Sequence, residues 1–299
     1  IDIRVSTMPG AWGESISLRI LAKSGNFVKM KDLGFSERDF EVVDKIIRRP
    51  NGIFLVTGPT GSGKSTSLYS FLHEVNTMDV RILTAEDPIE YQMDGIIQVQ
   101  MNKDIGLDFA RTLRAFLRQD PDKIMVGEIR DRETAEIAIN ASLTGHMVFS
   151  TLHTNDAAGA VTRFVDMNVA PYLLSSTLEG VLGQRLVRTC CSECRKAYKP
   201  DDETLERISL TRDQIGERPF YSGHGCKTCN GTGYKGRIAV HEIMYMNENM
   251  RSVVAHEKSL AALREAAKAN GMVTLWESCR ALVDKGITSI QELMTLNVE

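Results

Sequence analysis

The chain has 299 residues, which is enough for about two domains at roughly 150 residues each. Hydrophobic residues make up 42% and charged residues 25%, as in ordinary globular proteins, and no apolar run is long enough for a membrane span. The formal net charge of −3 argues against a protein whose whole surface binds nucleic acid, although it leaves a local basic groove open. We expect no signal peptide, and six cysteines in a chain of this size do not indicate a disulfide scaffold.

Residues 1–22 have the pattern of a β-hairpin, with alternating stretches on both sides of a turn that contains proline and glycine. Arg4 and Arg19 lie one on each expected strand and are ordinarily interpreted as solvated side chains. Because the chain begins at Ile1 within a strand pattern, we expect that the natural protein has a further N-terminal portion. Residues 23–35 are mixed in character and are expected to form a linker.

A phosphate-loop motif organises the centre of the chain. It follows a buried strand pattern at 53–57 and precedes a helix pattern at 65–75, the context that the motif requires. Its glycines let backbone N–H groups turn inward toward phosphate oxygens. Lys64 would place its charge on the β- and γ-phosphates, and the Ser65 hydroxyl would hold Mg²⁺. The motif has the pattern G-x-x-x-x-G-K-[ST] and comprises Gly58, Pro59, Thr60, Gly61, Ser62, Gly63, Lys64, Ser65 and Thr66.

Apolar strands alternate with helices around this motif. Ser36, with Asp39 at the box position, predicts a capped helix that precedes it. Such alternation is typical of an α/β fold with a mainly parallel sheet covered on both faces. Ligands of these sheets bind beyond the carboxyl ends of the strands. The further patterns are strands at 80–85, 123–127 and 147–152, and helices at 108–119 and 132–144.

Several side chains at these strand ends have the chemistry of phosphoryl transfer. Glu128 stands where an acidic residue serves Mg²⁺, although aspartate is usual there, so its contact could be through water. Glu90 is the better candidate for the base, and His153 could sense a γ-phosphate. Other interpretations stay open, since Asp87 could equally cap a loop and His146 could equally be a buried, satisfied histidine.

Two Cys-x-x-Cys pairs predict a structural metal module. Four thiolates suit tetrahedral Zn²⁺, and a closed shell of four sulfurs leaves no position for catalysis. The alternative is a loop with reduced cysteines, and Cys190 and His224 lie close enough in sequence to leave the ligand set open. Cys279, in a helical pattern, is expected to be buried. The predicted ligands are Cys191, Cys194, Cys226 and Cys229.

The last part of the chain returns to regular patterns. Alternation over 236–243 predicts a strand, and periodic apolar residues predict helices at 260–270 and 275–284. These helices are expected to pack on the nucleotide-binding part of the chain or on a neighbouring subunit.

Four motifs together resemble those of the secretion ATPases that drive type II secretion and type IV pilus assembly. The phosphate loop is similar to their first nucleotide motif, and 85–91 to their aspartate box. Residues 126–131 are similar to their second acidic motif, and 144–155 to their histidine box. Four motifs in this order are far more specific than a lone phosphate loop, and the resemblance covers essentially the whole chain.

The resemblance implies a RecA-like P-loop NTPase fold with a predominantly parallel sheet, a small zinc module and a C-terminal helical subdomain. It assigns 1–22 to the end of a separate α+β N-terminal domain and 36–188 to the ATPase domain. It assigns 189–236 to the tetracysteine zinc module and 237–299 to the helical subdomain. Assembly and secretion members carry a similar tetracysteine element that retraction members generally lack, which favours an extrusion motor.

The resemblance also implies roles for individual residues. Glu90 would be the catalytic carboxylate, Glu128 would serve the Mg²⁺ site, and His153 would touch the γ-phosphate, with Lys64 on the phosphates. Guanidinium groups suit the charge that spreads over phosphoryl oxygens. The arginines expected around the nucleotide are Arg4, Arg19, Arg114, Arg118 and Arg130.

Family members are hexameric rings with nucleotide near subunit boundaries. The resemblance therefore implies a homohexamer that consumes ATP and passes domain motions to an inner-membrane platform and its assembly proteins, in the cytoplasm at the inner membrane. The alternative is a ring-shaped nucleic-acid translocase of conjugation or DNA uptake. The acidic net charge and the lack of an aromatic and basic stripe count against it, so we expect no stable nucleic-acid partner. A third interpretation, a scaffold that binds ATP but barely hydrolyses it, is disfavoured by the complete set of candidate catalytic residues.

Overall fold

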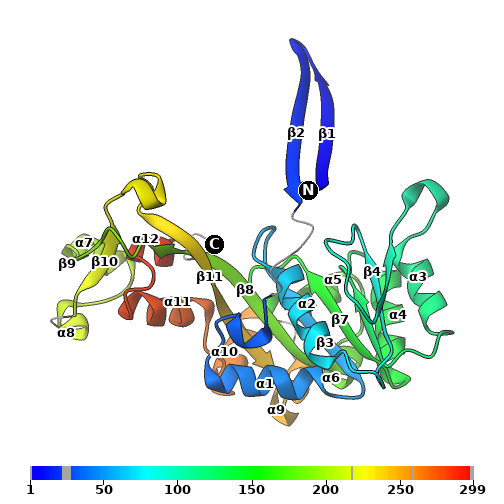
Figure 1. Ribbon diagram of the computed structural model, residues 1–299. Coiled ribbons are helices and arrows are strands. Elements are labelled where there is room, and N and C mark those ends of the chain that lie inside the picture. Colours follow the sequence, from blue (N-terminus) through cyan, green and yellow to red (C-terminus); the bar gives the residue numbers. More distant parts are fainter. Residues whose placement is uncertain (1, 22–27, 217, 258, 297–299) are drawn as a thin grey trace.

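A seven-stranded sheet forms the centre of the protein (Figure 1). The computed structural model describes residues 2–21, 28–216, 218–257 and 259–296. The strand order is β11-β8-β3-β7-β6-β4-β5, with parallel neighbours except for the antiparallel pair β8 and β11. The predicted α/β class is therefore confirmed. The strands are β3 (Gly52–Thr57), β4 (Ile82–Glu86), β5 (Ile96–Gln100), β6 (Lys123–Val126), β7 (Met147–Leu152), β8 (Leu178–Cys190) and β11 (Tyr234–Tyr245).

Both faces of this sheet are buried, which explains why its central strands are largely apolar. In β3, Ile53 and Leu55 enter one core cluster, whereas Phe54 and Val56 enter the other. One face is covered by η1 (Met30–Asp32), α1 (Glu37–Ile47) and α2 (Lys64–Val75). The other face is covered by α3 (Phe109–Phe116), α4 (Arg132–Leu143), α5 (Gly159–Asp166), α6 (Pro171–Thr177), α9 (Glu248–His256) and α10 (Leu260–Ala269).

Where the sequence predicted a helix, its start agrees with the structure to within about a residue. The Ser36 side chain accepts the Asp39 N–H at 3.1 Å, which confirms the predicted cap of α1. Asp108 caps α3, after a short η2 (Lys103–Ile105). The end of the expected linker is part of the core, because Met30 and Leu33 are buried under α2.

The first two strands form a separate hairpin, as predicted. β1 (Asp2–Gly10) pairs with β2 (Gly13–Leu21), and the turn is shorter than expected because Pro9 already pairs with Glu14. A proline is tolerated there because neither strand of a two-stranded sheet needs to donate on its outer side. Arg4 and Arg19 pair through their backbones, but their side chains lie outside the described residues.

Strands β5 and β8 were not predicted, and β8 is the more informative omission. Its buried first half carries Glu179 and Gln184, which interrupt the apolar pattern that signals a central strand. Both polar side chains have partners from other elements, so burial does not leave them unsatisfied.

Among the described residues, no helix combines the length and apolarity that crossing a bilayer requires.

The distal halves of β8 and β11 extend beyond the central sheet into a smaller lobe (Figure 1). A third core cluster forms there around Val187 and Val240. The expected boundaries after residues 188 and 236 fall inside β8 and β11, and the division into domains stays a prediction. The other elements of the lobe are β9 (Arg195–Tyr198), α7 (Asp202–Arg207), α8 (Arg212–Ile215), β10 (Phe220–Gly223), η3 (Lys227–Cys229), α11 (Leu275–Asp284) and α12 (Ile290–Met294).

Glu179 connects β8 to both neighbouring layers. Its carboxylate, 7% exposed, lies 2.8 Å from Arg49 beyond α1 and 2.8 Å from Arg251 of α9. Gly52 makes room for it, because a Cβ there would stand 2.3 Å from the Glu179 Cγ.

We predict that Glu179→Ala lowers the free energy of unfolding by about 2 kcal/mol, because it leaves two partly buried arginines without their common anion. Urea unfolding followed by circular dichroism measures this value. The matched control is Glu265→Ala, which removes an exposed partner of Lys268 and should cause no measurable loss. Equal effects of the two substitutions would contradict this role of Glu179.

Candidate functional site

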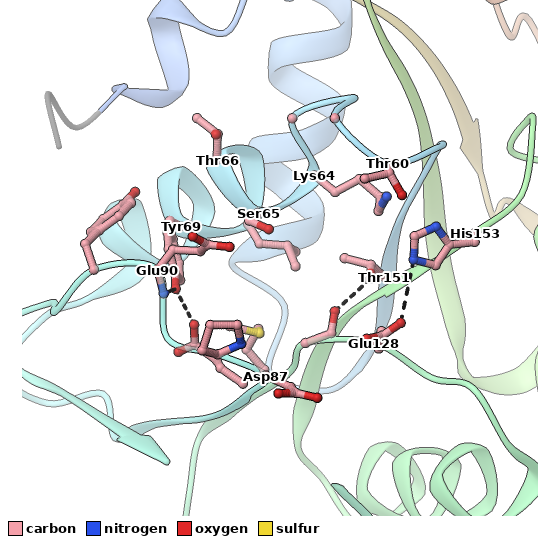
Figure 2. Close-up of a pocket in the computed structure, with 18 of the residues that line it drawn as sticks. Thr60, Lys64, Ser65, Thr66, Tyr69, Asp87, Glu90, Glu128, Thr151 and His153 are labelled. Atoms are coloured by element: carbon pink, nitrogen blue, oxygen red, sulfur yellow. Dashed lines mark hydrogen bonds and ion pairs between the residues drawn. The ribbon is translucent and has the colours of Figure 1, made fainter. Parts of the chain in front are cut away.

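A cavity of about 830 Å³ opens at the carboxyl ends of the parallel strands (Figure 2). The phosphate loop follows β3, Glu128 follows β6 and His153 follows β7, so parallel pairing brings these segments to the same edge. The cavity is lined by all four of the predicted catalytic residues, Lys64, Glu90, Glu128 and His153.

The phosphate loop is supported from β8 by Gln184. The Gln184 Nε2 donates to the Ser62 carbonyl at 2.8 Å, and the Ser67 hydroxyl donates to the Gln184 Oε1 at 2.7 Å. The backbone of Gln184 also lies close to the start of the loop. A side chain at position 58 would not fit, because a Cβ on Gly58 would lie 2.4 Å from the Gln184 carbonyl oxygen. Gly63 has a φ of +88° and begins the turn into α2.

The Lys64 ammonium group points back into the loop. It donates to the carbonyl oxygens of Gly58 at 2.8 Å and Pro59 at 3.0 Å. Burial lowers the pKa of Lys64, although the nearby Glu128 carboxylate opposes this shift. In Figure 2 the ammonium group lies on the same side of the cavity as His153.

The groups of the loop fit a phosphate and its magnesium ion. The Ser62 hydroxyl is buried without a hydrogen-bond partner among the described residues, and a Cβ on Gly61 would meet only open space. The hydroxyl of Ser65 and the carboxylate of Glu128 face this cavity and are the hard oxygen ligands that Mg²⁺ prefers.

Glu128 is held at the cavity by its neighbours. Gly127 allows β4 and β6 to approach closely, because its N–H donates to the Ala85 carbonyl at 2.8 Å and a Cβ would stand 3.2 Å from that oxygen. Glu128 forms an ion pair with Arg130, and its other oxygen lies 3.6 Å from the His153 Nε2.

The two candidate histidines lie at opposite ends of β7. His153 lines the cavity, where burial and then the Lys64 charge lower its pKa, so the neutral imidazole is favoured near neutral pH. His146 precedes the strand, and its Nδ1 lies 2.9 Å from the Ala141 carbonyl oxygen. The interpretation of His146 as a satisfied structural residue is therefore supported.

Glu90 reaches the cavity from the loop that follows β4. In Figure 2 its carboxylate projects toward Ser65, across the cavity from Glu128 and His153. Asp87 also lines the cavity, and so does Glu86 at the end of β4, although the Glu86 side chain is largely buried.

The predicted arginines occupy different positions. Arg130 contacts the site through Glu128. Arg114 of α3 pairs with Glu133, and Arg118, just beyond the end of α3, donates to the Arg114 carbonyl at 3.0 Å; both are exposed and lie outside the cavity lining.

Sequence reasoning missed Gln184 of β8 and Arg237 of β11. Arg237 lines the cavity and contributes a cation that no motif contains. The alternation over 236–243 predicted its strand, but the pairing of β11 with β8 determines that this strand reaches the phosphate loop.

The two Cys-x-x-Cys pairs meet in one cluster in the smaller lobe. Neighbouring sulfurs are 3.8, 3.8 and 3.7 Å apart. Four sulfurs bound about 2.3 Å from a tetrahedral centre would be about 3.8 Å apart, so the spacing fits a metal ion. Among the described residues, this metal-ligand cluster contains Cys191, Cys194, Cys226 and Cys229 but neither Cys190 nor His224.

The backbone around the cluster is closely packed. A Cβ on Gly223 would lie 1.9 Å from the Gly233 carbonyl oxygen, so two chain segments touch backbone to backbone. The Gly233 N–H donates to the Cys229 sulfur at 3.3 Å, and such bonds stabilise a metal-bound thiolate. The Cys190 thiol instead points toward the Tyr221 carbonyl oxygen at 3.8 Å.

The chain is similar over its full length to proteins of bacterial pilus assembly and secretion. The chain is 48% identical over its full length to the type IV pilus assembly ATPase PilB of Thermus thermophilus, and covers 34% of that protein. It is 47% identical over its full length to the type II secretion system protein E of Pseudomonas aeruginosa, and covers 59% of it. The chain thus spans between about one third and three fifths of the length of these curated relatives.

Solved structures agree with this relationship. The crystal structure of the pilus retraction motor PilT with bound ADP has a TM-score of 0.71 at 29% identity, over 99% of this chain and 74% of the other. The ATPase DotB of Legionella pneumophila has a TM-score of 0.72 at 24% identity, over 99% of this chain and 72% of DotB, and shares the fold. The family model described as type II/IV secretion system protein matches residues 1–295. The chain therefore belongs to the type II/IV secretion system protein family.

Proposed function

We propose that the protein is a motor ATPase that hydrolyses ATP to ADP and phosphate to power type II protein secretion or type IV pilus assembly. The observation that carries this proposal is that one cavity is lined by Lys64, Glu90, Glu128 and His153. Relatives that match the whole chain are a pilus assembly ATPase and a secretion protein E, which supports the choice of machine.

The phosphate loop and α2 bind the triphosphate in this proposal. Lys64 exchanges its bonds to the loop carbonyls for the β- and γ-phosphates, and the Ser62 hydroxyl gains a partner. Mg²⁺, when bound, neutralises charge on the phosphates, and the Ser65 hydroxyl and Glu128 would hold it.

Glu90 orients the attacking water and accepts its proton. Its carboxylate enters the cavity from a different loop than Glu128, which permits one carboxylate to serve the metal and the other the water. His153, which lines the cavity beside Glu128, donates to the γ-phosphate.

Further cations come from arginines that the single chain does not bring into the cavity. Arg114 on α3 and Arg118 just beyond its end are exposed, so their proposed role requires a neighbouring subunit of a homohexamer. Arg4 and Arg19 would approach from the N-terminal domain, and Arg130 reorients from Glu128. We propose that the motor acts in the cytoplasm, at an inner-membrane platform that receives the domain motions.

The cysteine cluster is proposed to hold a structural zinc ion. The four sulfurs supply a closed tetrahedral shell, and the short spacing between them supports zinc over a loop of separate thiols. Its role is to hold together the two ends of the connection between β8 and β11, each of which carries one of the cysteine pairs.

Lys64→Ala is expected to abolish nucleotide binding or hydrolysis, because the buried cation that faces the phosphates is lost. Binding of a fluorescent ATP analogue and phosphate release measure the two steps. Lys268→Ala, on an exposed turn of α10, serves as the control and should keep both. Undiminished hydrolysis by Lys64→Ala would refute the assignment of the site.

Glu90→Gln is expected to lower kcat about 100-fold or more while ATP affinity stays nearly unchanged, because the amide cannot accept a proton from water. Steady-state phosphate release and equilibrium binding distinguish the two quantities. Glu248→Gln, on α9, should alter neither. An equal loss of binding and turnover would indicate that Glu90 is structural.

Metal analysis of the purified protein is expected to find about one zinc ion per chain. Cys191→Ser should lose the zinc, because three thiolates hold it much more weakly, whereas Cys279→Ala, which lies outside the cluster, should retain it. A folded wild-type sample without bound metal would contradict the zinc assignment.

A further inference from the structure

A buried hydrogen-bond network joins α2 to the loop that carries Glu90. The Tyr69 hydroxyl donates to the Glu86 carboxylate and accepts the backbone N–H of Glu90 at 3.1 Å. Tyr69 is 1% exposed and Glu86 is 4% exposed although both border the cavity, so water has little access to either side chain. Figure 2 shows Tyr69 beneath the cavity, beside Glu90.

Glu86 is a buried carboxylate that depends on neutral donors. Besides Tyr69, it accepts the Thr84 hydroxyl at 2.5 Å and the Gln98 Nε2 at 3.0 Å. A buried carboxylate costs free energy unless donors replace its water, so these bonds strongly favour one arrangement. Burial and the contact with Glu86 raise the pKa of Tyr69 well above its usual range, so its hydroxyl stays protonated as a donor.

The loop is held at a second point by Gln98 of β5. The Gln98 Nε2 also donates to the Tyr91 carbonyl at 3.2 Å, and its Oε1 accepts the Met93 N–H at 2.8 Å. The Tyr91 ring packs edge-on against the Tyr69 ring, with centroids 4.4 Å apart. The backbone on both sides of Tyr91 is therefore fixed by α2 and β5.

We propose that Tyr69 is a positioning residue that sets the place of the Glu90 carboxylate relative to the bound phosphates. α2 begins at Lys64, so Tyr69 lies one and a half turns beyond the phosphate loop on the same rigid helix. Its hydroxyl acts through the Glu90 backbone and leaves the phosphate-binding groups untouched. The proposal rests on the ATPase function proposed above.

The test is Tyr69→Phe, which keeps the ring but removes both hydrogen bonds of the hydroxyl. We expect kcat for ATP to fall about 10-fold or more, because a small displacement of a catalytic group has a large effect on rate. The affinity for magnesium-ATP should stay within about 2-fold, because the phosphate loop does not contact the hydroxyl. Phosphate release and equilibrium binding give the two values, and a thermal melt reports folding.

The matched control is Tyr234→Phe. Its hydroxyl also has two partners, Ser289 at 2.7 Å and Gln291 at 3.1 Å, but lies in the smaller lobe. The Tyr234→Phe variant should be less stable than the wild type but have the same kcat. This control distinguishes the effect of losing any two tyrosine hydrogen bonds from the effect of losing those that hold the Glu90 loop.

The double variant with Glu90→Gln tests whether Tyr69 acts through Glu90. If it does, Tyr69→Phe causes no further loss of kcat once the carboxylate is gone. Multiplicative losses in the double variant would overturn the proposal, as would an unchanged kcat in Tyr69→Phe. A combined loss of affinity and kcat would also overturn it, since that pattern indicates a general structural role.

Gln98→Met keeps the inference testable if Tyr69→Phe does not fold. It removes the second attachment of the loop and is expected to show the same selective fall in kcat. A wild-type protein that binds but does not hydrolyse ATP would overturn the proposed function and this inference together. An active wild type with an unaffected Gln98→Met and Tyr69→Phe would overturn the inference alone.

Discussion

Parallel hydrogen-bonded pairing of β3, β7, β6 and β4 is the constraint on which the site depends. In the ladder, Val56 pairs with Thr151, and Val126 pairs with both Ser150 and Ala85. Residues that follow each strand therefore emerge at one edge and at nearly the same height. Segments distant in the chain thereby supply a phosphate loop, two carboxylates and an imidazole to a single cavity.

β8, which pairs with β3, and β11, which pairs with β8, connect this cavity to the smaller lobe. β8 supplies Gln184 to the phosphate loop, and β11 supplies Glu242, whose carboxylate accepts the N–H groups of Ala157 at 2.6 Å and Leu275 at 3.1 Å. Burial raises the pKa of Glu242, although both backbone N–H groups oppose this shift. The loop after β7 and the start of α11 are thus held by one side chain between them.

Polar side chains inside the protein account for most of what sequence patterns failed to predict. Tyr69 has the appearance of an ordinary apolar position of α2, and Gln98 that of an exposed position in an unpredicted strand. Their importance depends on partners from other elements, such as Glu86. Similarly, Gln184 appears as an interruption of an apolar pattern until its contact with Ser67, 117 residues away, is known.

The sequence by itself determined the α/β class, the phosphate loop, the strand-end carboxylates and the two cysteine pairs, because each is encoded by neighbouring residues with fixed spacing. Only the tertiary structure decided that β8 and β11 complete the sheet, that His153 and not His146 faces the cavity, and that Gln184, Tyr69 and Arg237 belong around it. The physical reason is that burial of a polar side chain becomes favourable only through a partner, and the partner is selected by the folded chain.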